Sequence, residues 1–292
     1  MSAAWPALLA PEALHAQLGT PGLVVVDCRY ALSDPAAGER AYAQGHVPGA
    51  HYAHLHRDLS GPHRPGGGRH PWPEAAAFAH RLAGWGVEAT SRVVAYDDAD
   101  GGFAARLWHL LRATGHREAA VLDGGWAAWC GLGLPVSTDA PASARAPLRP
   151  LSWRAPPLDA DAVRAHLDAG GLLVDARAAE RFRGEAEPID PVAGHVPGAV
   201  NRPHAANLGG DGRFKPAAAL RREFEALLDG RAPGQAAMMC GSGVYACHHL
   251  LAMAHAGLDG ARLYAGSWSG WIEDPSRPVA VGDEAPAGDA SP

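Results

Sequence analysis

Short, continuous apolar runs alternate along the chain with segments in which apolar residues recur every three to four positions. The runs are LVVVD (23–27), RVVAY (92–96), AAVLD (119–123), GLLVD (171–175), AAMM (236–239) and ARLY (261–264). The segments between them, such as PEAAAFAHRLAGWG and KPAAALRREFEALL, have the period of a helix. Strands that are apolar on both faces and interleaved with helices predict an α/β fold, with mostly parallel sheets that carry helices on both faces.

The order of motifs in the first half of the chain recurs in the second half. LVVVDCRY followed by GHVPGA recurs as LLVDARAAERF followed by GHVPGA, and AVLDGGWAAW recurs as RLYAGSWSGW. Self-similarity of this kind indicates duplicated structural units. We therefore expect two homologous domains, at 1–137 and 152–285. A linker rich in Pro, Ala and Ser joins them at 138–151, and a tail follows at 286–292.

Composition and charge narrow the range of partners and compartments. The formal net charge of −6 gives no basic surface for nucleic acid or an anionic membrane, so we expect a small-molecule or protein partner. The N-terminal stretch lacks the pattern of a signal peptide, and no run reaches the roughly 18 apolar residues of a membrane span. We expect a cytoplasmic protein. Its four cysteines, without a CxxC pair, are expected to be reduced thiols.

The segment MMCGSGVYAC at 238–247 contains the candidate nucleophile. Cys240 follows an apolar strand and precedes Gly241, Ser242 and Gly243, after which a helical pattern begins. The amide groups of such a turn and the positive end of a helix dipole favour an anion, so they would favour the thiolate of Cys240. Taken alone, the loop is equally compatible with a buried structural thiol.

Comparison of the two halves favours the reactive thiol. At the place that corresponds to Cys240, the first half has Asp97, in YDDADGGFAAR. If only one of two duplicated loops keeps a thiol, the second domain is expected to be catalytic and the first to be a scaffold. In open parallel sheets the ligand site lies beyond the carboxyl ends of the strands, which is where AAMM places Cys240.

Taken together, the duplicated VD-C/A-R and GHVPGA segments, GRHPWP at 68–73, the CGSGV loop and the GGWAAW and GSWSGW endings resemble the tandem-domain rhodanese family of sulfurtransferases. The resemblance covers nearly the whole chain. It implies a second-domain cysteine that cycles between thiol and persulfide and moves a sulfane sulfur from a donor to a thiol or cyanide acceptor, with no metal or organic cofactor. Acceptors of this kind include reduced thioredoxin and glutathione.

The loop sequence also resembles one branch of that family. Thiosulfate sulfurtransferases typically have basic residues after the cysteine, whereas 3-mercaptopyruvate sulfurtransferases typically have CG[ST]GV, as here. The resemblance implies that 3-mercaptopyruvate is the donor and pyruvate the product, with thiosulfate as the alternative donor. In the expected site Gly241, Gly243, Val244 and Tyr245 line the substrate.

Matched by position, further residues receive roles from the same resemblance. Arg181 corresponds to the arginine that binds the donor's carboxylate, and Ser242 to the hydroxyl that positions or protonates the substrate. His70 corresponds to a first-domain histidine that extends to the site. Asp175 and Arg177 are expected to brace the loop through an ion pair.

The chain also departs from the pattern of the mercaptopyruvate branch. Tyr245 stands where that branch has threonine, Ile189 stands where it has a second arginine, and His56 aligns with an acidic residue of the first domain. The first two departures bear on the donor, and the third argues against a Cys-His-Asp triad.

Two other functional classes fit the sequence less well than a sulfurtransferase. A cysteine phosphatase needs an arginine six residues after the nucleophile, where this chain has Ala246. A rhodanese-like module that only binds a partner would keep the fold but contain an inert Cys240. The sixteen histidines do not form a complete metal-ligand set, so no metal site is expected.

Overall fold

The computed structural model describes residues 5–141 and 145–283. It divides into two compact units. The first contains residues up to Gly61 together with Pro73–Pro156 and Leu208–Phe214, and the second contains Pro62–Trp72, Pro157–Asn207 and residues from Lys215 onward. Positions 142–144 of the expected linker and the expected tail at 286–292 lie outside the described residues.

The first unit contains the elements β1 (Leu8–Leu9), α1 (Pro11–His15), β2 (Leu23–Asp27), α2 (Ala37–Gln44), β3 (His51–Tyr52), α3 (Leu55–Asp58), α4 (Ala75–Gly84), β4 (Arg92–Tyr96), α5 (Gly102–Thr114), β5 (Ala119–Leu122) and α6 (Gly125–Gly131). Its strands form one sheet in the order β1-β5-β4-β2-β3, and every pairing is parallel. The apolar runs expected to be the strands at 23–27 and 92–96 form β2 and β4.

Both faces of this sheet are covered. Every residue of β5 is buried, and since consecutive side chains of a strand point to opposite faces, neither face is open to solvent. Trp129 of α6 and Leu14 of α1 pack with Val94 and Leu122 on one face. Helix α5 contacts β4 and β5 as well. The prediction of an α/β fold with helices on both faces is confirmed for this unit.

The second unit contains the elements α7 (Ala160–Asp168), β6 (Leu172–Asp175), α8 (Ala179–Phe182), β7 (Ala199–Asn201), the 3-10 helices η1 (His204–Asn207) and η2 (Pro233–Gln235), α9 (Ala217–Leu228), β8 (Ala236–Met239), α10 (Ala246–His255), β9 (Arg262–Leu263) and α11 (Ser267–Trp271). The strand order is β7-β6-β8-β9, again with parallel pairings only.

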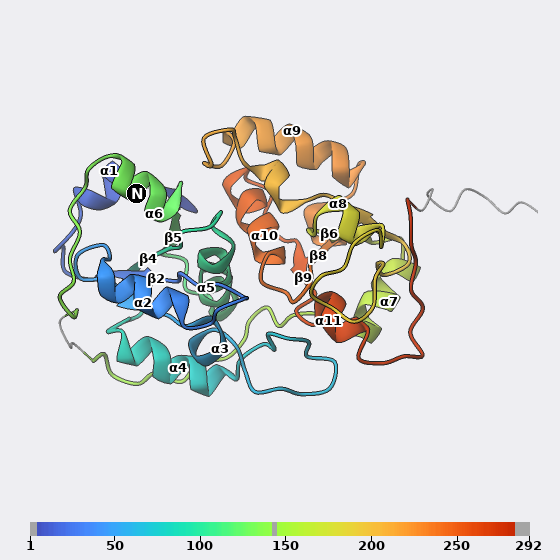
Figure 1. Ribbon diagram of the computed structural model, residues 1–292, viewed down its shortest axis with the longest axis horizontal. Coiled ribbons are helices and arrows are strands. Elements are labelled where there is room, and N and C mark those ends of the chain that lie inside the picture. Colours follow the sequence, from blue (N-terminus) through green and yellow to red (C-terminus); the bar gives the residue numbers. More distant parts are fainter. Residues whose placement is uncertain (1–4, 142–144, 284–292) are drawn as a thin grey trace, which may run out of the picture. The chain divides into compact units, whose positions relative to one another are not determined.

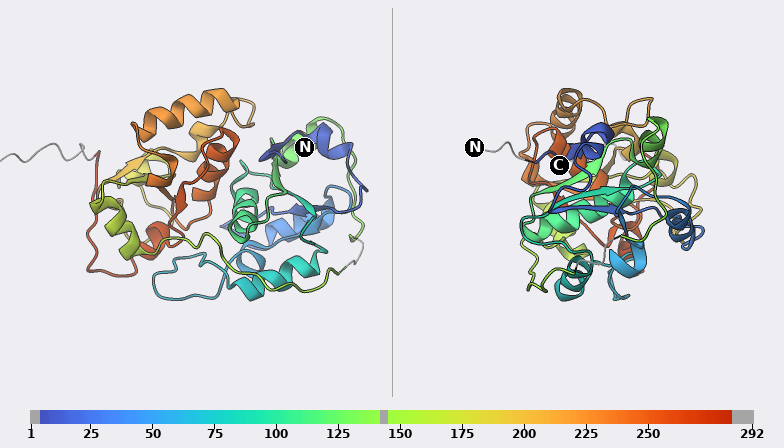
Figure 2. Two further views of the ribbon diagram at one scale, coloured as in Figure 1. Left: turned by 180° about the vertical axis from the view of Figure 1, so that it is seen from behind. Right: turned by 90° about the vertical axis from the view of Figure 1, so that its left-hand side faces the viewer.

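The apolar residues of β6 and β8 pack against different helices on the two faces. Leu173, Ala237 and Met239 pack with Val163 of α7 and Trp268 of α11. Helices α9 and α10 pack on each other, and α10 also contacts β8. Figure 1 shows α9 and α10 on one side of the strands and α7 and α11 on the other. The view from behind in Figure 2 shows the same two layers. The α/β prediction is confirmed here too.

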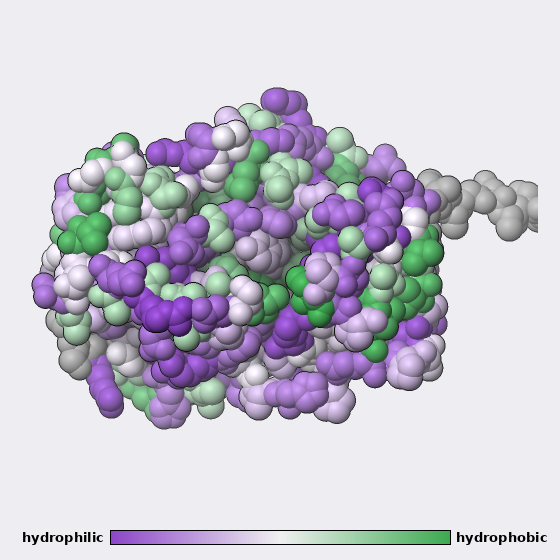
Figure 3. All heavy atoms as spheres, viewed as in Figure 1, coloured by the Kyte–Doolittle hydropathy of each residue, from purple (hydrophilic) through white to green (hydrophobic). Residues whose placement is uncertain are grey.

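The surface of the protein is mixed in hydropathy. On the face shown in Figure 3, hydrophilic and hydrophobic residues are interspersed. Among residues 5–141 and 145–283, no helix has the length and apolar character needed to cross a membrane.

In the first unit, the loop after β4 binds a carboxylate of its own. Asp97 is buried, and its two oxygens accept hydrogen bonds from the backbone N–H groups of Ala99 (3.0 Å), Gly101 (3.0 Å) and Ala104 (2.9 Å). Burial raises the pKa of Asp97 to about 6, although these N–H groups oppose the rise. The turn at the end of this central strand is therefore built around an anion, as the sequence predicts for its counterpart.

This raised pKa gives a pH dependence that can be measured. The unfolded chain loses the Asp97 proton near pH 3.8 and the folded unit near pH 6, so the folded state holds more protons between these values. We expect Asp97 to lower the stability of the fold by about 2 kcal/mol as the pH rises from 4 to 7. Asp97→Asn cannot titrate. The free energy of unfolding measured with urea should therefore fall over this pH range for the wild type relative to the variant. Parallel stability curves for the two proteins would contradict the prediction.

Candidate active site

Cys240 lies directly beyond the carboxyl end of β8, and both sides of its backbone are held. Its N–H donates to Oγ of Ser267 (3.1 Å), and its carbonyl accepts from the N–H of Trp268 (3.0 Å). The side chain of Ser267 donates in turn to the carbonyl of Tyr264 (2.9 Å). Ser267 has a positive φ of 51°, an uncommon conformation outside glycine that marks a tightly determined turn. These contacts fix the position of a thiol that is only 3% exposed.

Gly243 closes the loop after Cys240. Its φ is +74°, and a Cβ at this position would lie 2.3 Å from the carbonyl oxygen of Ala265. Only glycine fits this close approach of two backbone segments. The carbonyl of Gly241 also accepts a hydrogen bond from the N–H of Ser269 (2.9 Å). The loop is thus anchored along its length to the segment that precedes and begins α11.

An ion pair at the end of β6 supports the same region. The guanidinium of Arg177 binds both oxygens of Asp175, at distances of 2.7–3.1 Å, and its Nη2 donates to the carbonyl of Gly194 (2.8 Å). Its Cζ lies 4.9 Å from the ring centroid of Trp268. Since the N–H of Trp268 binds the carbonyl of Cys240, the pair connects the strand end, the GHVPGA segment and the thiol loop.

Ser242 and His70 are brought together by the fold. Their side chains are buried, and Oγ of Ser242 is 2.7 Å from Nδ1 of His70, within hydrogen-bond distance. They are 172 residues apart in the sequence. A hydroxyl hydrogen-bonded to an imidazole two residues after the thiol can pass a proton at the site.

The segment Pro62–Trp72, which contains His70, belongs to the second unit and is tied to it by several contacts. The carboxylate of Glu273 accepts hydrogen bonds from the N–H groups of Gly66 (2.6 Å) and Gly68 (3.1 Å). Oγ of Ser269 accepts from the N–H of Arg69 (3.0 Å). These backbone contacts set the positions from which two polar side chains of this segment, Arg69 and His70, extend to the loop.

Two guanidinium groups lie next to Gly241. A Cβ placed on Gly241 would be 3.4 Å from Nη2 of Arg69 and 3.7 Å from both Nη1 and Nη2 of Arg181. Both side chains are mostly buried, with 25% and 16% of their surfaces exposed. The structure therefore places the guanidinium groups of Arg181 and Arg69 beside the residue that follows the thiol, and the binding of a donor by Arg181 stays a prediction.

Two buried carboxylates hold these arginines. Glu187 binds Nε of Arg181 (3.2 Å) and Nη2 (2.7 Å), and Asp190 bridges Nη2 of Arg181 (3.2 Å) and Nη1 of Arg69 (2.6 Å). Glu187 also lies 3.5 Å from Arg177. Burial raises the pKa of Glu187, but hydrogen bonds from Arg181 and from backbone N–H groups outweigh it and hold that pKa below its ordinary value. Glu187 is therefore an anion at neutral pH.

The two remaining loop residues assigned from the sequence point elsewhere. The side chain of Val244 is buried in the core, with 2% exposed. The ring of Tyr245 packs on that of His204, with the centroids 4.4 Å apart. Any contact of either residue with a substrate, including one through its backbone amide, stays a prediction.

The positions at which the chain departs from the family pattern also have defined surroundings. Ile189 is 43% exposed, and its N–H donates to Glu187 (3.1 Å). His56 belongs to the first unit, where its Nε2 lies 3.0 Å from the hydroxyl of Tyr30.

Sequence reasoning missed four residues of this site: Arg69, Glu187, Asp190 and Glu273. The only signal for Arg69 was its place in GRHPWP, from which His70 alone was assigned a role. In EPID at 187–190 the sequence shows an isoleucine in place of the expected arginine, but no pattern distinguishes Glu187 and Asp190 from surface acids.

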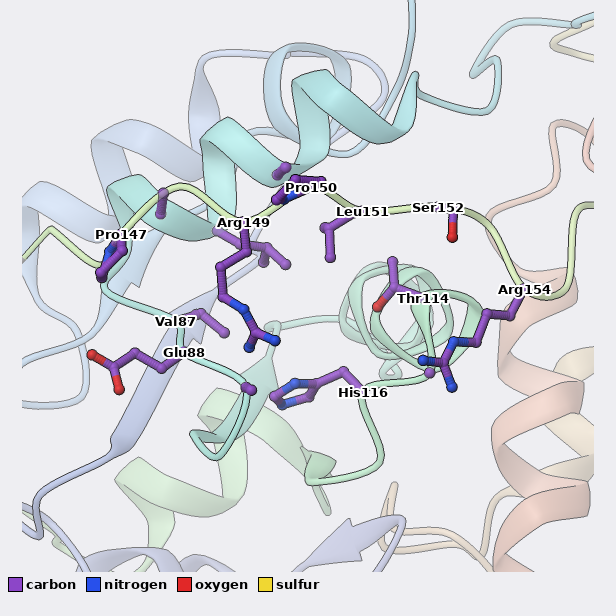
Figure 4. Close-up of a pocket in the computed structure, with 15 residues that line it drawn as sticks. Val87, Glu88, Thr114, His116, Pro147, Arg149, Pro150, Leu151, Ser152 and Arg154 are labelled. Carbon is purple, nitrogen blue, oxygen red and sulfur yellow. The ribbon is translucent and has the colours of Figure 1, made fainter.

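A separate pocket of about 250 Å³ lies in the first unit. It is lined by residues of α4, the end of α5 and the segment 147–154. In Figure 4 the side chains of Arg149 and His116 point toward each other in it, while Glu88 points away. No cysteine lines this pocket, so the chemistry is assigned to the Cys240 loop. In the part of the chain that the structure describes, no group of His, Cys, Asp and Glu could hold a metal ion.

Comparison with known proteins agrees with this geometry. The family described as Rhodanese-like domain matches residues 10–132 and 159–274. A "Probable 3-mercaptopyruvate sulfurtransferase" of Pseudomonas aeruginosa is 51% identical over 284 residues, covering 94% of this chain and 98% of the relative. The thiosulfate sulfurtransferase of Bos taurus is 32% identical and covers 89% of each chain.

A solved structure shows the same fold. The 3-mercaptopyruvate sulfurtransferase from Leishmania major matches with a TM-score of 0.79 and 29% identity, covering 90% of this chain and 73% of that one. The duplicated motifs, the two parallel sheets and these matches lead to one conclusion: the chain belongs to the rhodanese family and contains two rhodanese-like domains.

Proposed function

We propose that this protein is a sulfurtransferase that moves a sulfane sulfur from 3-mercaptopyruvate, through a persulfide on Cys240, to a thiol acceptor and releases pyruvate. The observation that carries the proposal is the position of Cys240 in a backbone-anchored loop at the carboxyl end of β8, beside two guanidinium groups. The relative that is 51% identical is named for the same activity.

The donor assignment follows from the charges of the loop. No Lys or Arg occurs between Cys240 and Cys247, so the loop itself contributes no cation for a second negative charge on the donor. Arg181 and Arg69 lie beside Gly241, one residue from the thiol. A donor with one carboxylate, and with its sulfur a few bonds from that carboxylate, matches this arrangement.

In the first step the thiolate of Cys240 attacks the sulfur of 3-mercaptopyruvate. An S–S bond forms, the C–S bond of the donor breaks, and its electron pair passes to the enolate of pyruvate. The enolate takes up one proton, which leaves a Cys240 persulfide and pyruvate. This is covalent catalysis by a sulfur nucleophile, in which the transferred sulfur is oxidised and the donor carbon is reduced.

Ser242 is the group we assign to proton transfer in this step. Its hydroxyl is buried two residues after the thiol and is held by Nδ1 of His70 (2.7 Å). The hydrogen bond between them gives a short path by which a proton can reach the developing enolate. Arg181 would contribute a hydrogen bond and positive charge to the binding of the donor's carboxylate, while the amides of Gly241 and Gly243 and of the two residues that follow line the site.

In the second step an acceptor thiol removes the outer sulfur. Reduced thioredoxin or glutathione fits this role, and cyanide can replace them in an assay. The described cysteines are all free, which suits a thiol cycle in a reducing compartment, and we therefore propose a cytoplasmic location. The cycle requires no metal or organic cofactor.

Thiosulfate is the second candidate donor. Two arginines beside Gly241 could offset its two charges, and a relative that is 32% identical is named thiosulfate sulfurtransferase. The carboxylates of Glu187 and Asp190 already offset much of that positive charge, which favours the monoanionic donor. The third candidate function is a module that only binds a partner. Formation of a persulfide on Cys240 would distinguish either enzyme from such a module.

Cys240→Ser should abolish persulfide formation. After incubation with 3-mercaptopyruvate, intact-mass analysis of the wild type should show an adduct of about 32 Da, the mass of one sulfur atom. The matched control is Cys130→Ser, which removes an exposed thiol of α6 and should keep the adduct. An adduct on the Cys240→Ser protein, or none on the wild type with any sulfane donor, would contradict the mechanism.

The two candidate donors can be ranked by steady-state kinetics. We expect kcat/KM with cyanide as acceptor to be at least about tenfold higher for 3-mercaptopyruvate than for thiosulfate, a difference of about 1.4 kcal/mol in transition-state binding. A higher value for thiosulfate would show that the neutral loop does not set the donor.

Arg181→Gln should chiefly weaken donor use. Loss of a charge-assisted hydrogen bond costs about 1.5–3 kcal/mol, so KM for 3-mercaptopyruvate should rise about 10- to 100-fold. Arg183→Gln is the control, because Arg183 is two residues away and pairs with the exposed Glu185. An unchanged KM in Arg181→Gln, or an equal rise in both variants, would remove Arg181 from the donor site.

A further inference from the structure

We infer that Arg69, in the segment Pro62–Trp72, is the arginine that binds the donor's carboxylate through two parallel hydrogen bonds. It would take the place of the arginine that is absent at position 189. The inference deepens the proposed function and rests on it. Three features carry it: the hydrogen bonds that the Arg181 guanidinium already makes, the edge of the Arg69 guanidinium that lacks a partner, and the bridge that Asp190 forms between the two.

Most N–H groups of the Arg181 guanidinium already have hydrogen-bond partners within the protein. Its Nε and Nη2, which form the side-on edge of a guanidinium, both donate to Glu187, at 3.2 and 2.7 Å. Nη2 donates to Asp190 as well (3.2 Å). Of the three nitrogens of the Arg181 guanidinium, only Nη1 makes no hydrogen bond to a described residue. Arg181 can therefore give a donor a single strong contact and general positive charge, but not the two parallel hydrogen bonds that make an arginine selective for a carboxylate.

Arg69 has the opposite arrangement. Its Nη1 donates to Asp190 (2.6 Å), while its Nε is buried and has no hydrogen-bond partner in the part of the chain that the structure describes. A buried donor without a partner is costly, and it needs an explanation in a native site. Nη2, the other half of the same edge, lies 3.4 Å from the point where a Cβ on Gly241 would be. A guanidinium edge with a buried, unpaired N–H thus borders the thiol loop.

Asp190 fixes how this fork is presented. Its side chain is 3% exposed and bridges the two arginines, so each guanidinium is held on one edge by a buried carboxylate. The N–H of Asp190 donates to Glu187 (3.1 Å), which ties this bridge to the network around Arg181. With one edge of Arg69 fixed in this way, a donor carboxylate can bind Nε and Nη2 without a further loss of side-chain freedom.

The absence of an arginine at position 189 fits the same assignment of Arg69. Ile189 carries no charge, is 43% exposed and precedes Asp190 directly. An arginine at 189 would start from the same short segment that now supplies Asp190. In this chain the segment at 189–190 supplies the carboxylate of Asp190, and the segment Pro62–Trp72 supplies Arg69, whose guanidinium that carboxylate binds.

The test compares two donors that differ only in the carboxylate. 3-Mercaptopyruvate carries it, and mercaptoacetone has a methyl group in its place, with the same thiol beside a ketone. Single-turnover formation of the Cys240 persulfide is followed by intact mass with each donor. Arg69→Met should slow the reaction with subsaturating 3-mercaptopyruvate about 10- to 100-fold and leave that with mercaptoacetone within about threefold. Arg69→Lys, which keeps the charge but not the fork, should stay closer to Arg69→Met than to the wild type.

Arg64→Met is the matched control. Arg64 lies in the same segment and donates to the carbonyl of Trp72 (3.2 Å), so its loss tests whether a weakened segment alone explains the result. The ratio of the two donor rates should stay at the wild-type value in this variant. An equal fall with both donors in Arg69→Met, or an unchanged ratio, would overturn the assignment of Arg69. A wild type that takes sulfur from neither donor would instead overturn the proposed function.

Discussion

The buried pair of Asp175 and Arg177 is the interaction on which the site depends. It closes the end of β6, binds the carbonyl of Gly194 and lies against Trp268, whose N–H holds the carbonyl of Cys240. The first unit repeats it, because Arg29 binds Asp27 and the carbonyl of Gly45 and lies over Trp126. A buried ion pair is strongly destabilising when one partner is removed, so it gives each unit a rigid base for the loop above it.

Beside that base, the site gathers charges of both signs at close range. Three arginines, at 69, 177 and 181, face three carboxylates, at 175, 187 and 190, and the contacts between them leave few polar atoms without partners. Such a network holds its side chains in place before a ligand arrives, which reduces the ordering cost of binding. Among the described residues, Nε of Arg69 is the buried donor of these three arginines that has no hydrogen-bond partner. We propose that the donor's carboxylate binds there.

The sequence predicted those parts of the molecule that depend on local pattern. The apolar runs gave β2, β4, β5, β6 and β8, and the duplicated motifs gave the α/β architecture of both halves. The position of Cys240 at the end of β8 followed from the run before it. Arg69 could not be assigned in this way, because its neighbours Asp190 and Gly241 are distant in sequence and meet it only once Glu273 and Ser269 hold the segment Pro62–Trp72. Its role depends on which edge of a guanidinium is occupied, and no sequence pattern records that.

The turns that follow β4 and β8, at corresponding places in the two halves, surround different side chains. After β4 the turn donates three backbone N–H groups to the carboxylate of Asp97, and after β8 the corresponding position carries a thiol. A carboxylate in this place satisfies the turn permanently, since it is a fixed part of the chain. A thiol accepts hydrogen bonds more weakly than a carboxylate, so Cys240 could exchange one partner for another in the sulfur transfer that we propose. Gly125 and Ser267, at matching positions beyond the two loops, share a positive φ, and the N–H groups of Trp126 and Trp268 bind the carbonyls of Asp97 and Cys240, so the two loops are anchored in the same way. The half to which we assign the reaction therefore differs from the other in the residue that follows the central strand, Cys240 in place of Asp97, and in the arginines placed beside it.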